Sequence, residues 1–285
     1  MAVTVRPLTD ADLPAVLAHL RPTEERSTFL VGNALEAGIT DRGGPRNGPW
    51  VGAFDGERLV GVVAYARGPA SLLVACGGCA AALLTDVARL GVRPRLLLGT
   101  ADRVDEALAA LPARWRVERR KHETLMVLRW PERVPAPPLR RPASIETPTA
   151  AHVADVARLL DTLTAASEIP RTPAENLARA ERIAREGTAT VAVVGGRAVA
   201  LSSRAAATGH FVHVGATATD PAGRRAGFAG ACVDAILHRA RADGCARDGA
   251  VLFTGETNLA AQALYARLGF RPLARFDLCV MAAPA

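Results

Sequence analysis

Two neighbouring arginines and a glycine precede an apolar helix in the second half of the sequence, and this combination suits an anion. They lie in "GATATDPAGRRAGFAGACVDAIL" (Gly215 to Leu237), where Arg224 and Arg225 are followed by Gly227. Backbone N–H groups at a helix start bind anions, aided by the helix dipole. Glycine lets a ligand approach the backbone, and arginine adds donors for phosphate. The stretch therefore fits a pyrophosphate site, although a solvated helix start with exposed arginines would have the same residues.

The residues around this stretch predict a mixed α/β fold for the second half of the chain. Alternating apolar residues indicate strands, and apolar residues at helical spacing indicate helices. Strands are expected at 143–147, 188–194, 197–204, 211–219 and 249–255, with a closing strand or two after Phe270. Helices are expected at 151–163, 173–186, 226–243 and 258–268. This order predicts a mixed sheet with helices on its faces.

The first half repeats this layout, which predicts two tandem domains. The segment "VTVRPLTDADLPAVLAHL" near the start has the same order of strand, threonine turn and amphipathic helix as "ASIETPTAAHVADVARLL" after residue 142. Between them, "WPERVPAPPLRRPA" (Trp130 to Ala143) is rich in proline, which favours extended chain and indicates a linker. A chain of 285 residues is long enough for two cores. We therefore predict domains over 1–130 and 143–285, joined by a linker over 131–142.

A second motif follows the arginine pair along the chain. The segment "NLAAQALYARLGF" has the pattern N-x-x-A-x-x-x-Y-x-x-x-G-F, formed by Asn258, Ala261, Tyr265, Gly269 and Phe270. Together with "VGATATDPAGRRAGFAGACVDAIL", it resembles the GNAT superfamily of acyl-coenzyme A (acyl-CoA) N-acyltransferases. The resemblance implies two tandem GNAT-like mixed-sheet α/β domains with helices on both faces, the first of them degenerate. It also implies acyl-CoA, in the first place acetyl-CoA, as the donor and an amine, on a small molecule or a peptide, as the acceptor.

The resemblance assigns the coenzyme contacts to one strand, one loop and one helix start. The strand would pair with the pantetheine arm through main-chain hydrogen bonds, and a backbone N–H group there could polarise the thioester carbonyl. The loop N–H groups would hold the pyrophosphate, and Asn258 would either touch the pantetheine or cap the following helix. The coenzyme-binding residues are then Thr217, Ala218, Thr219, Arg224, Arg225, Ala226, Gly227, Phe228, Ala229 and Asn258.

Tyr265 and His213 are the candidate catalytic residues. In the family, a tyrosine at the position of Tyr265 lies beside the coenzyme sulfur and can protonate the departing thiolate, which suits a phenol. The alternative is a tyrosine that packs on an amphipathic helix. His213 could take the proton of the attacking amine, and strand alternation puts it on the face of Thr217 unless a bulge intervenes. It could equally be structural; His210 and Glu256 are lesser candidates for this role.

The acceptor cannot be read from the sequence. It would be bounded by the first two helices of the second half, with Glu168 in their connecting loop as a possible contact to the amine. The coenzyme is expected in the second half only, one for each chain. Where the second copy has Asn258 and Tyr265, the first has Asp102 and Ala109, and it has no arginine pair.

Composition excludes several other kinds of protein. The formal charge of +7 comes from scattered arginines with a single lysine, so nucleic acid is an unlikely partner. No apolar run approaches a membrane span and the N-terminus has no export signal, so we expect a cytoplasmic protein. An odd count of five cysteines agrees with a reducing compartment. Cys76 and Cys79 have C-x-x-C spacing but no further ligands nearby, so we expect packing rather than a metal site.

Three other functions compete with acyl transfer. The second half could sense acyl-CoA without turnover, although Tyr265 argues against that. An aminoacyl-tRNA-dependent transferase would share the fold, but the intact phosphate loop favours CoA. A basic nucleic-acid-binding protein would show salt-dependent binding to DNA. No feature of the sequence predicts an oligomeric state.

Overall fold

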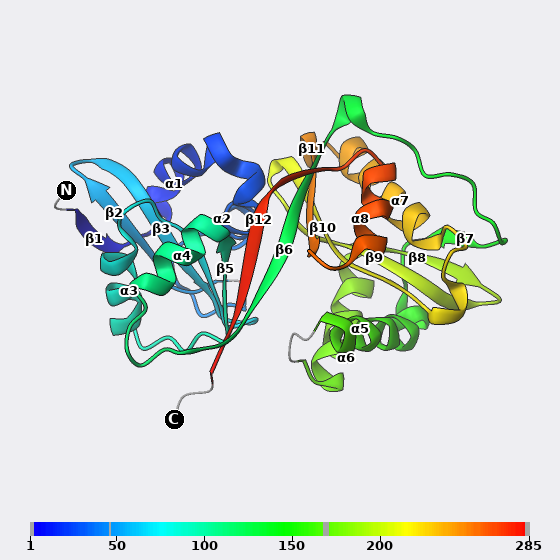
Figure 1. Cartoon of the computed structure of the whole chain (residues 1–285), viewed down its shortest axis with the longest axis horizontal. Coiled ribbons are helices and arrows are strands. Elements are labelled where there is room, and N and C mark those ends of the chain that lie inside the picture. Colours follow the sequence, from blue (N-terminus) through cyan, green and yellow to red (C-terminus); the bar gives the residue numbers. More distant parts are fainter. Residues whose placement is uncertain (1–2, 46, 168–170, 283–285) are drawn as a thin grey trace. The chain divides into compact units, whose positions relative to one another are not determined.

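A computed structural model describes residues 3–45, 47–167 and 171–282 of the chain (Figure 1). The chain divides into two compact units, and neither is a continuous segment. The first unit comprises Met1–Leu125, Phe253–Thr257 and Pro272–Ala285, and the second comprises Met126–Leu252 and Asn258–Arg271. These units differ from the predicted division at 131–142, because the first unit includes the last strand of the chain and the second unit begins at Met126, inside a strand of the first half.

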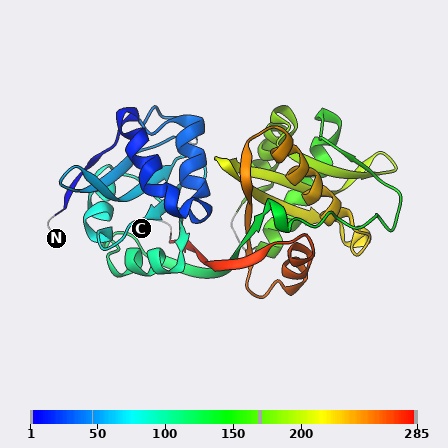
Figure 2. The ribbon, with the colours of Figure 1, turned by 90° about the horizontal axis from the view of Figure 1, so that it is seen from above.

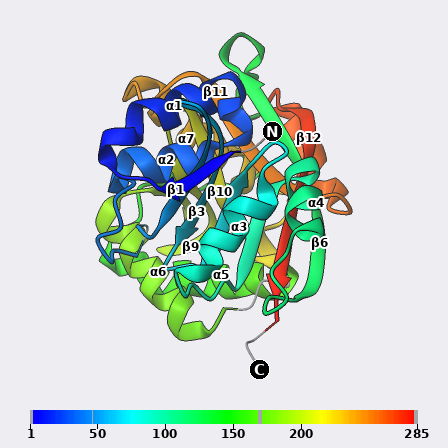
Figure 3. The same cartoon turned by 90° about the vertical axis from the view of Figure 1, so that its left-hand side faces the viewer.

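The strands of the first unit include one from the C-terminal end of the chain. Their order is β1 (Thr4–Pro7), β2 (Trp50–Asp55), β3 (Arg58–Ala66), β4 (Ser71–Ala75), β5 (Leu96–Thr100) and β12 (Arg271–Met281). Helices α1 (Leu13–Leu20) and α2 (Thr28–Ala37) lie on one side, and α3 (Ala80–Arg89) and α4 (Ala101–Ala109) lie on the other (Figure 3). Only the β4–β5 pair is parallel among the registers described for these strands.

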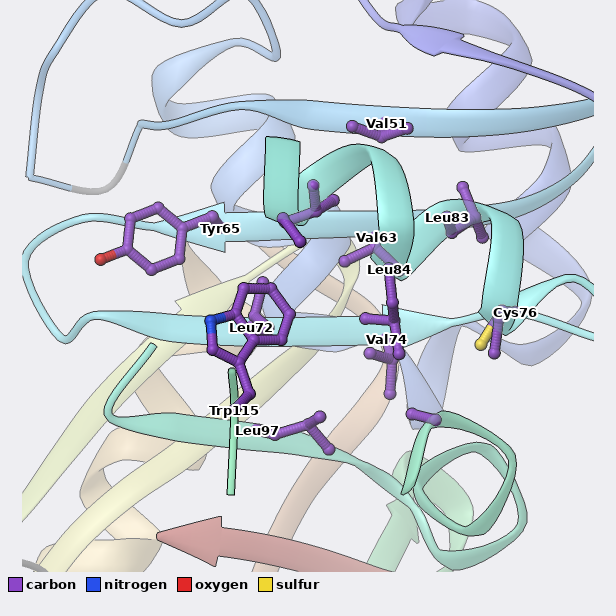
Figure 4. Packing of buried hydrophobic residues seen from close by; sticks show 14 of the residues in the cluster. Val51, Val63, Tyr65, Leu72, Val74, Cys76, Leu83, Leu84, Leu97 and Trp115 are labelled. Carbon is purple, nitrogen blue, oxygen red and sulfur yellow. The ribbon is translucent and has the colours of Figure 1, made fainter. Parts of the chain in front are cut away.

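The core of the first unit lies between its strands and the helices α3 and α4 (Figure 4). Trp115 and Tyr65 close one end of this core, and the Tyr65 hydroxyl donates to the carbonyl oxygen of Arg93 at 3.2 Å. Cys76 and Cys79 are buried in it with free thiols, which confirms the packing role predicted for them. Burial raises the pKa of the Cys76 thiol to about 12 and raises that of Cys79, so both stay protonated at neutral pH.

The second unit contains the elements predicted for the second half, within a few residues. Its strands have the order β6 (Val117–Arg129, in this unit from Met126 on), β11 (Ala246–Gly255, in this unit up to Leu252), β10 (Gly209–Thr219), β9 (Arg197–Ala207), β8 (Ala189–Val194) and β7 (Ser144–Glu146). Its helices are α5 (Val153–Ser167), α6 (Pro173–Glu186), α7 (Phe228–Ala242) and α8 (Leu259–Arg267). The strands and helices of the two units confirm the predicted tandem α/β architecture.

Residues at both ends of helix α6 explain why the sequence predicts its bounds. Thr172 caps its start by accepting from the backbone N–H of Glu175, whose side chain accepts in return from the Thr172 N–H. Pro173 occupies the first helical position. The helix ends at Gly187, whose φ of 63° is the left-handed conformation that glycine adopts freely.

Each unit contains residues from both halves of the sequence. The end of β6 brings Met126 and Leu128 into the core of the second unit, beside residues of α7 such as Ile236. In the first unit, β12 pairs with β5, with Phe276 opposite Thr100. Hence the closing strand expected after Phe270 exists but belongs to the first unit. Within the described part of the chain, no helix is both long and apolar enough to span a lipid bilayer.

Candidate functional site

Strands β10 and β11 are paired over only part of their length. The parallel register runs from Gly209 opposite Ala246 to His213 opposite Val251 and, in the described part of these strands, goes no further. On its other edge β10 continues to pair with β9 as far as Thr219. Residues 214–219 therefore have one backbone edge that no described strand pairs with, and an extended ligand can pair there as a strand would.

A bulge in β10 reverses which face of the sheet its side chains occupy. The register with β9 shifts between His213 and Val214 and again between Val214 and Thr217. Before the bulge, Val214 packs with residues of α7, whereas after it Ala218 packs in the cluster formed by α5 and α6. Thr217 and Thr219 consequently lie on the α7 side of the sheet.

His213 lies on the opposite side of the sheet from Thr217, on the face covered by α5 and α6. The bulge is the reason, because the expected alignment of His213 with Thr217 required a regular strand. His213 is only 3% exposed, and burial lowers the pKa of its imidazole to about 3. At neutral pH the imidazole is thus uncharged, and protonating it where it lies is unfavourable.

The loop from Asp220 to Gly227 leads from the open edge of β10 into α7, and we call it the phosphate loop. Arg225 has a φ of 63° and Gly227 a φ of 93°, so the chain takes two left-handed steps before the helix begins. Gly227 is the N-cap residue and has no side-chain capping bond, so the first N–H groups of α7 are left for another acceptor. Arg224 and Arg225 are exposed beside them. These residues fit the pyrophosphate of CoA, because uncapped helical N–H groups and arginines both bind phosphate.

The only acidic side chain of this loop is turned away from an incoming phosphate by an ion pair. The carboxylate of Asp220 accepts from Nη1 of Arg158 on α5 at 2.8 Å. Ala226 and Phe228 anchor the loop, since both are buried in a cluster with Cys232 of α7. Apolar contacts therefore fix the loop to the rest of the unit, and its polar groups face solvent.

Asn258 and Tyr265 take up their positions on α8. The Asn258 Oδ1 accepts from the backbone N–H of Ala261 at 3.2 Å, which confirms the cap predicted as one of its two roles. Tyr265 is 6% exposed and packs edge-on against Phe270, with ring centroids 5.9 Å apart. Its neighbours in the same cluster include Met126 from β6.

The lesser candidates for a catalytic base are engaged elsewhere or cannot be placed. The two ring nitrogens of His210 lie 2.8 Å from Asp248 and 2.8 Å from Arg247. Glu256 pairs with Arg275 at 3.4 Å in the first unit. Glu168, the expected amine contact, lies outside the described residues.

At the corresponding helix start in the first unit, that of α3, side chains of α4 occupy the backbone groups. Glu106 on α4 accepts from the backbone N–H of Ala80, the first residue of α3, at 3.0 Å. Arg103 donates to the carbonyl oxygen of Cys76, and its guanidinium fills the space where Gly77 lacks a Cβ. A carboxylate of the protein therefore takes the place where a phosphate would bind.

Sequence reasoning missed two groups of residues at these sites. One is the pair Arg103 and Glu106 of α4, which fills the loop before α3 in the first copy. The available signal was their spacing of three residues on a helix that follows β5. The other is the proline-rich segment, which was expected to be a linker only. Its backbone N–H at Arg140 donates to the carbonyl oxygen of Ala226 at 3.0 Å, so it lies against the phosphate loop.

Comparison with known proteins agrees with this geometry. Residues 156–270 match the family described as Acetyltransferase (GNAT) family. No curated protein matches the chain. Among solved structures, a GCN5-related N-acetyltransferase from Sphaerobacter thermophilus is 16% identical, with a TM-score of 0.63 over 97% of this chain and 94% of that one. A Drosophila protein is also 16% identical, with a TM-score of 0.69 over 98% and 99%.

A third structure shows that the resemblance extends to the tandem arrangement. It is a tandem GNAT protein from the clavulanic acid biosynthesis pathway, 17% identical, with a TM-score of 0.58 over the full length of both chains. At these identities the likeness concerns the fold, whereas the family match covers α5 to α8 and the phosphate loop. The second unit is therefore a domain of the GNAT acetyltransferase family, and the chain as a whole has the tandem GNAT fold.

Proposed function

We propose that the second unit transfers an acetyl group from acetyl-CoA directly to an amine of a small molecule or a peptide. The observation that carries this proposal is the continuity of an unpaired strand edge with an uncapped helix start. The open edge of β10 suits the amide groups of a pantetheine arm, and the loop before α7 suits a pyrophosphate. Acetyl-CoA supplies the acyl group as an activated thioester.

The strand and loop would bind and orient the donor. Backbone groups of Thr217, Ala218 and Thr219 would pair with the pantetheine arm, and one N–H group would polarise the thioester carbonyl. The N–H groups of residues 225–229, with the side chains of Arg224 and Arg225, would hold the pyrophosphate. Asn258 keeps α8 capped so that the helix is fixed beside this strand edge.

Tyr265 is our candidate for the proton donor to the departing thiolate. Its position on α8 follows the family motif, and a phenol is acidic enough to protonate a thiolate yet stays protonated at neutral pH. Its burial among apolar side chains would keep water away from the sulfur. We assign His213 a packing role rather than that of a base, because burial lowers its pKa to about 3.

The first unit would serve as a partner for folding rather than as a second active site, because its helix start is closed by Glu106. We further propose a reducing compartment such as the cytoplasm. All five cysteines are free, and burial raises the pKa of Cys232 to about 12.

Calorimetric titration of CoA into the whole chain, followed by a thiol-release assay with a panel of amines, tests the proposal. We expect one coenzyme for each chain and acetyl-CoA turnover with at least one amine. Binding without thiol release from any amine would favour an acyl-CoA sensor. Absence of CoA binding would overturn the assignment of the loop.

A further inference from the structure

The proline-rich segment 131–142 runs as a long loop from β6 to β7 and is hydrogen-bonded to the second unit near both of its ends (Figures 1 and 2). Near its start, Nη2 of Arg133 donates to the carboxylate of Asp234 on α7 at 2.6 Å. The backbone N–H of Val134 donates to the carbonyl oxygen of Leu268 at 3.1 Å. This end of the segment is thus fixed to both helices that flank the coenzyme site.

The other end of the segment is fixed to the phosphate loop itself. Arg140 donates its backbone N–H to the carbonyl oxygen of Ala226, and Nη1 of Arg141 donates to that of Ala222 at 3.3 Å. Leu139 packs into the cluster of Ala226 and Phe228, and its Cδ2 lies 3.6 Å from the position that a Cβ on residue 227 would take. The segment is a wall of the loop and not a free linker.

This contact brings four arginines together around the start of α7. Arg140 and Arg141 come from the segment, and Arg224 and Arg225 come from the loop. All four are exposed, and none has an acidic partner among the residues that the structure describes. Gathering like charges without counter-charges is unfavourable, and it creates a strong positive potential that attracts polyanions.

The charges of CoA can be divided between these two arginine pairs. CoA carries a pyrophosphate and, on its ribose, a separate 3′-phosphate. The loop N–H groups with Arg224 and Arg225 are assigned to the pyrophosphate. The 3′-phosphate then has no assigned partner, and Arg140 and Arg141 of the segment have no assigned ligand. We propose that Arg140 and Arg141 bind the 3′-phosphate and thereby select CoA over coenzymes that lack it. This inference rests on the proposed function, since it concerns the same coenzyme site.

The backbone anchor gives this role a physical basis. The hydrogen bond from the Arg140 N–H to Ala226 fixes the backbone and leaves the Arg140 guanidinium free to turn toward a ligand. A guanidinium binds a phosphate monoester through two parallel N–H bonds, and such charged bonds contribute more than neutral ones. The prolines on either side of the segment arginines limit the backbone conformations that would be lost on binding.

The test compares the affinities for CoA and for dephospho-CoA, which lacks only the 3′-phosphate, by calorimetry on the whole chain. The variants are Arg140→Gln, which keeps the backbone bond, and the double variant Arg140→Gln with Arg141→Gln. The control is Arg182→Gln with Arg185→Gln, two exposed arginines of α6 with the same loss of charge. Thermal unfolding of each variant verifies that it is folded.

We expect the unmodified chain to bind CoA at least about tenfold more tightly than dephospho-CoA. The double variant should lose most of this ratio by weakening CoA only, Arg140→Gln should lose part of it, and the control should keep it. Equal weakening of both ligands, an unchanged ratio, or tighter binding after the substitutions would overturn the inference while leaving the proposed function intact. Failure of the unmodified chain to bind either ligand would instead overturn the proposed function, and the inference with it.

Discussion

The two units start corresponding helices in opposite ways. At α3, the N–H of Ala80 is taken by Glu106 and the adjoining loop by Arg103, both from α4. At α7, the N-cap is Gly227, which has no side-chain capping bond, and the exposed charges beside it are positive. One fold thus provides a closed helix start in one copy and an open one in the other.

The difference assigns the proposed anion site to a few local residues rather than to the fold. The connection from β4 to α3 spans residues 76–79, and that from β10 to α7 spans residues 220–227. The longer connection can take two left-handed steps and expose its N–H groups, whereas the shorter one lies within reach of α4. A carboxylate from the protein competes with a phosphate for the same N–H groups, so the first unit is not expected to bind CoA.

The largest effect is expected from a carboxylate at the open helix start. Gly227→Asp should lower CoA affinity at least about a hundredfold, because the charge repels the pyrophosphate. The φ of 93° strains any side chain, so Gly227→Asn is the matched control of the same size. Asn and Asp adopt a positive φ with similar strain, but Asn carries no charge, so Gly227→Asn should retain much more affinity than Gly227→Asp. Calorimetry on both variants checks this, and equal losses would assign the effect to backbone strain.

The next effect concerns Tyr265, at whose position the first copy has Ala109. Tyr265→Phe should retain CoA binding and lower kcat by about ten- to a thousandfold, if the phenol protonates the thiolate. Tyr65→Phe in the first unit removes another buried hydroxyl, one that donates to the carbonyl oxygen of Arg93. It should leave kcat unchanged and cost about 1 kcal/mol of stability. Steady-state rates under conditions where chemistry limits turnover check both, and an unchanged kcat in Tyr265→Phe would return it to packing.

Much of this comparison could be predicted from the sequence, and the reasons differ by residue. The pattern R-x-x-G-x-A and the Asn258 cap are local signals, because the groups that they arrange lie within a few residues. The bulge that separates His213 from Thr217 is a matter of register between strands, which no local pattern specifies. The pairing of β12 with β5 likewise joins distant segments, so domain boundaries drawn along the sequence differ from the compact units.

A smaller effect, on the pH dependence of stability, is expected from His213, which is buried in β10. The matching strand β4 of the first unit has no such group, since it is apolar apart from Ser71. The folded pKa of His213 is about 3, against about 6.5 in the unfolded chain. As pH falls below 6.5, the unfolded state binds a proton that the folded state does not, so stability decreases. The expected loss between about pH 7 and about pH 5 is about 2 kcal/mol. Denaturant unfolding at both values should show this loss, and His213→Gln should lack it.

The smallest effect is expected at the closed helix start of the first unit. Glu106→Ala removes the carboxylate that accepts from the Ala80 N–H, which should cost about 1 kcal/mol of stability, as for other lost helix caps. Glu57→Ala, at an exposed turn between β2 and β3, is the control and should cost less. In Glu106→Ala the Arg103 guanidinium still occupies the short loop, and the first copy still lacks the arginine pair of the second. CoA titration should therefore give one site in Glu106→Ala as in the unmodified chain. A second site would show that Glu106 alone keeps the first copy from binding the coenzyme.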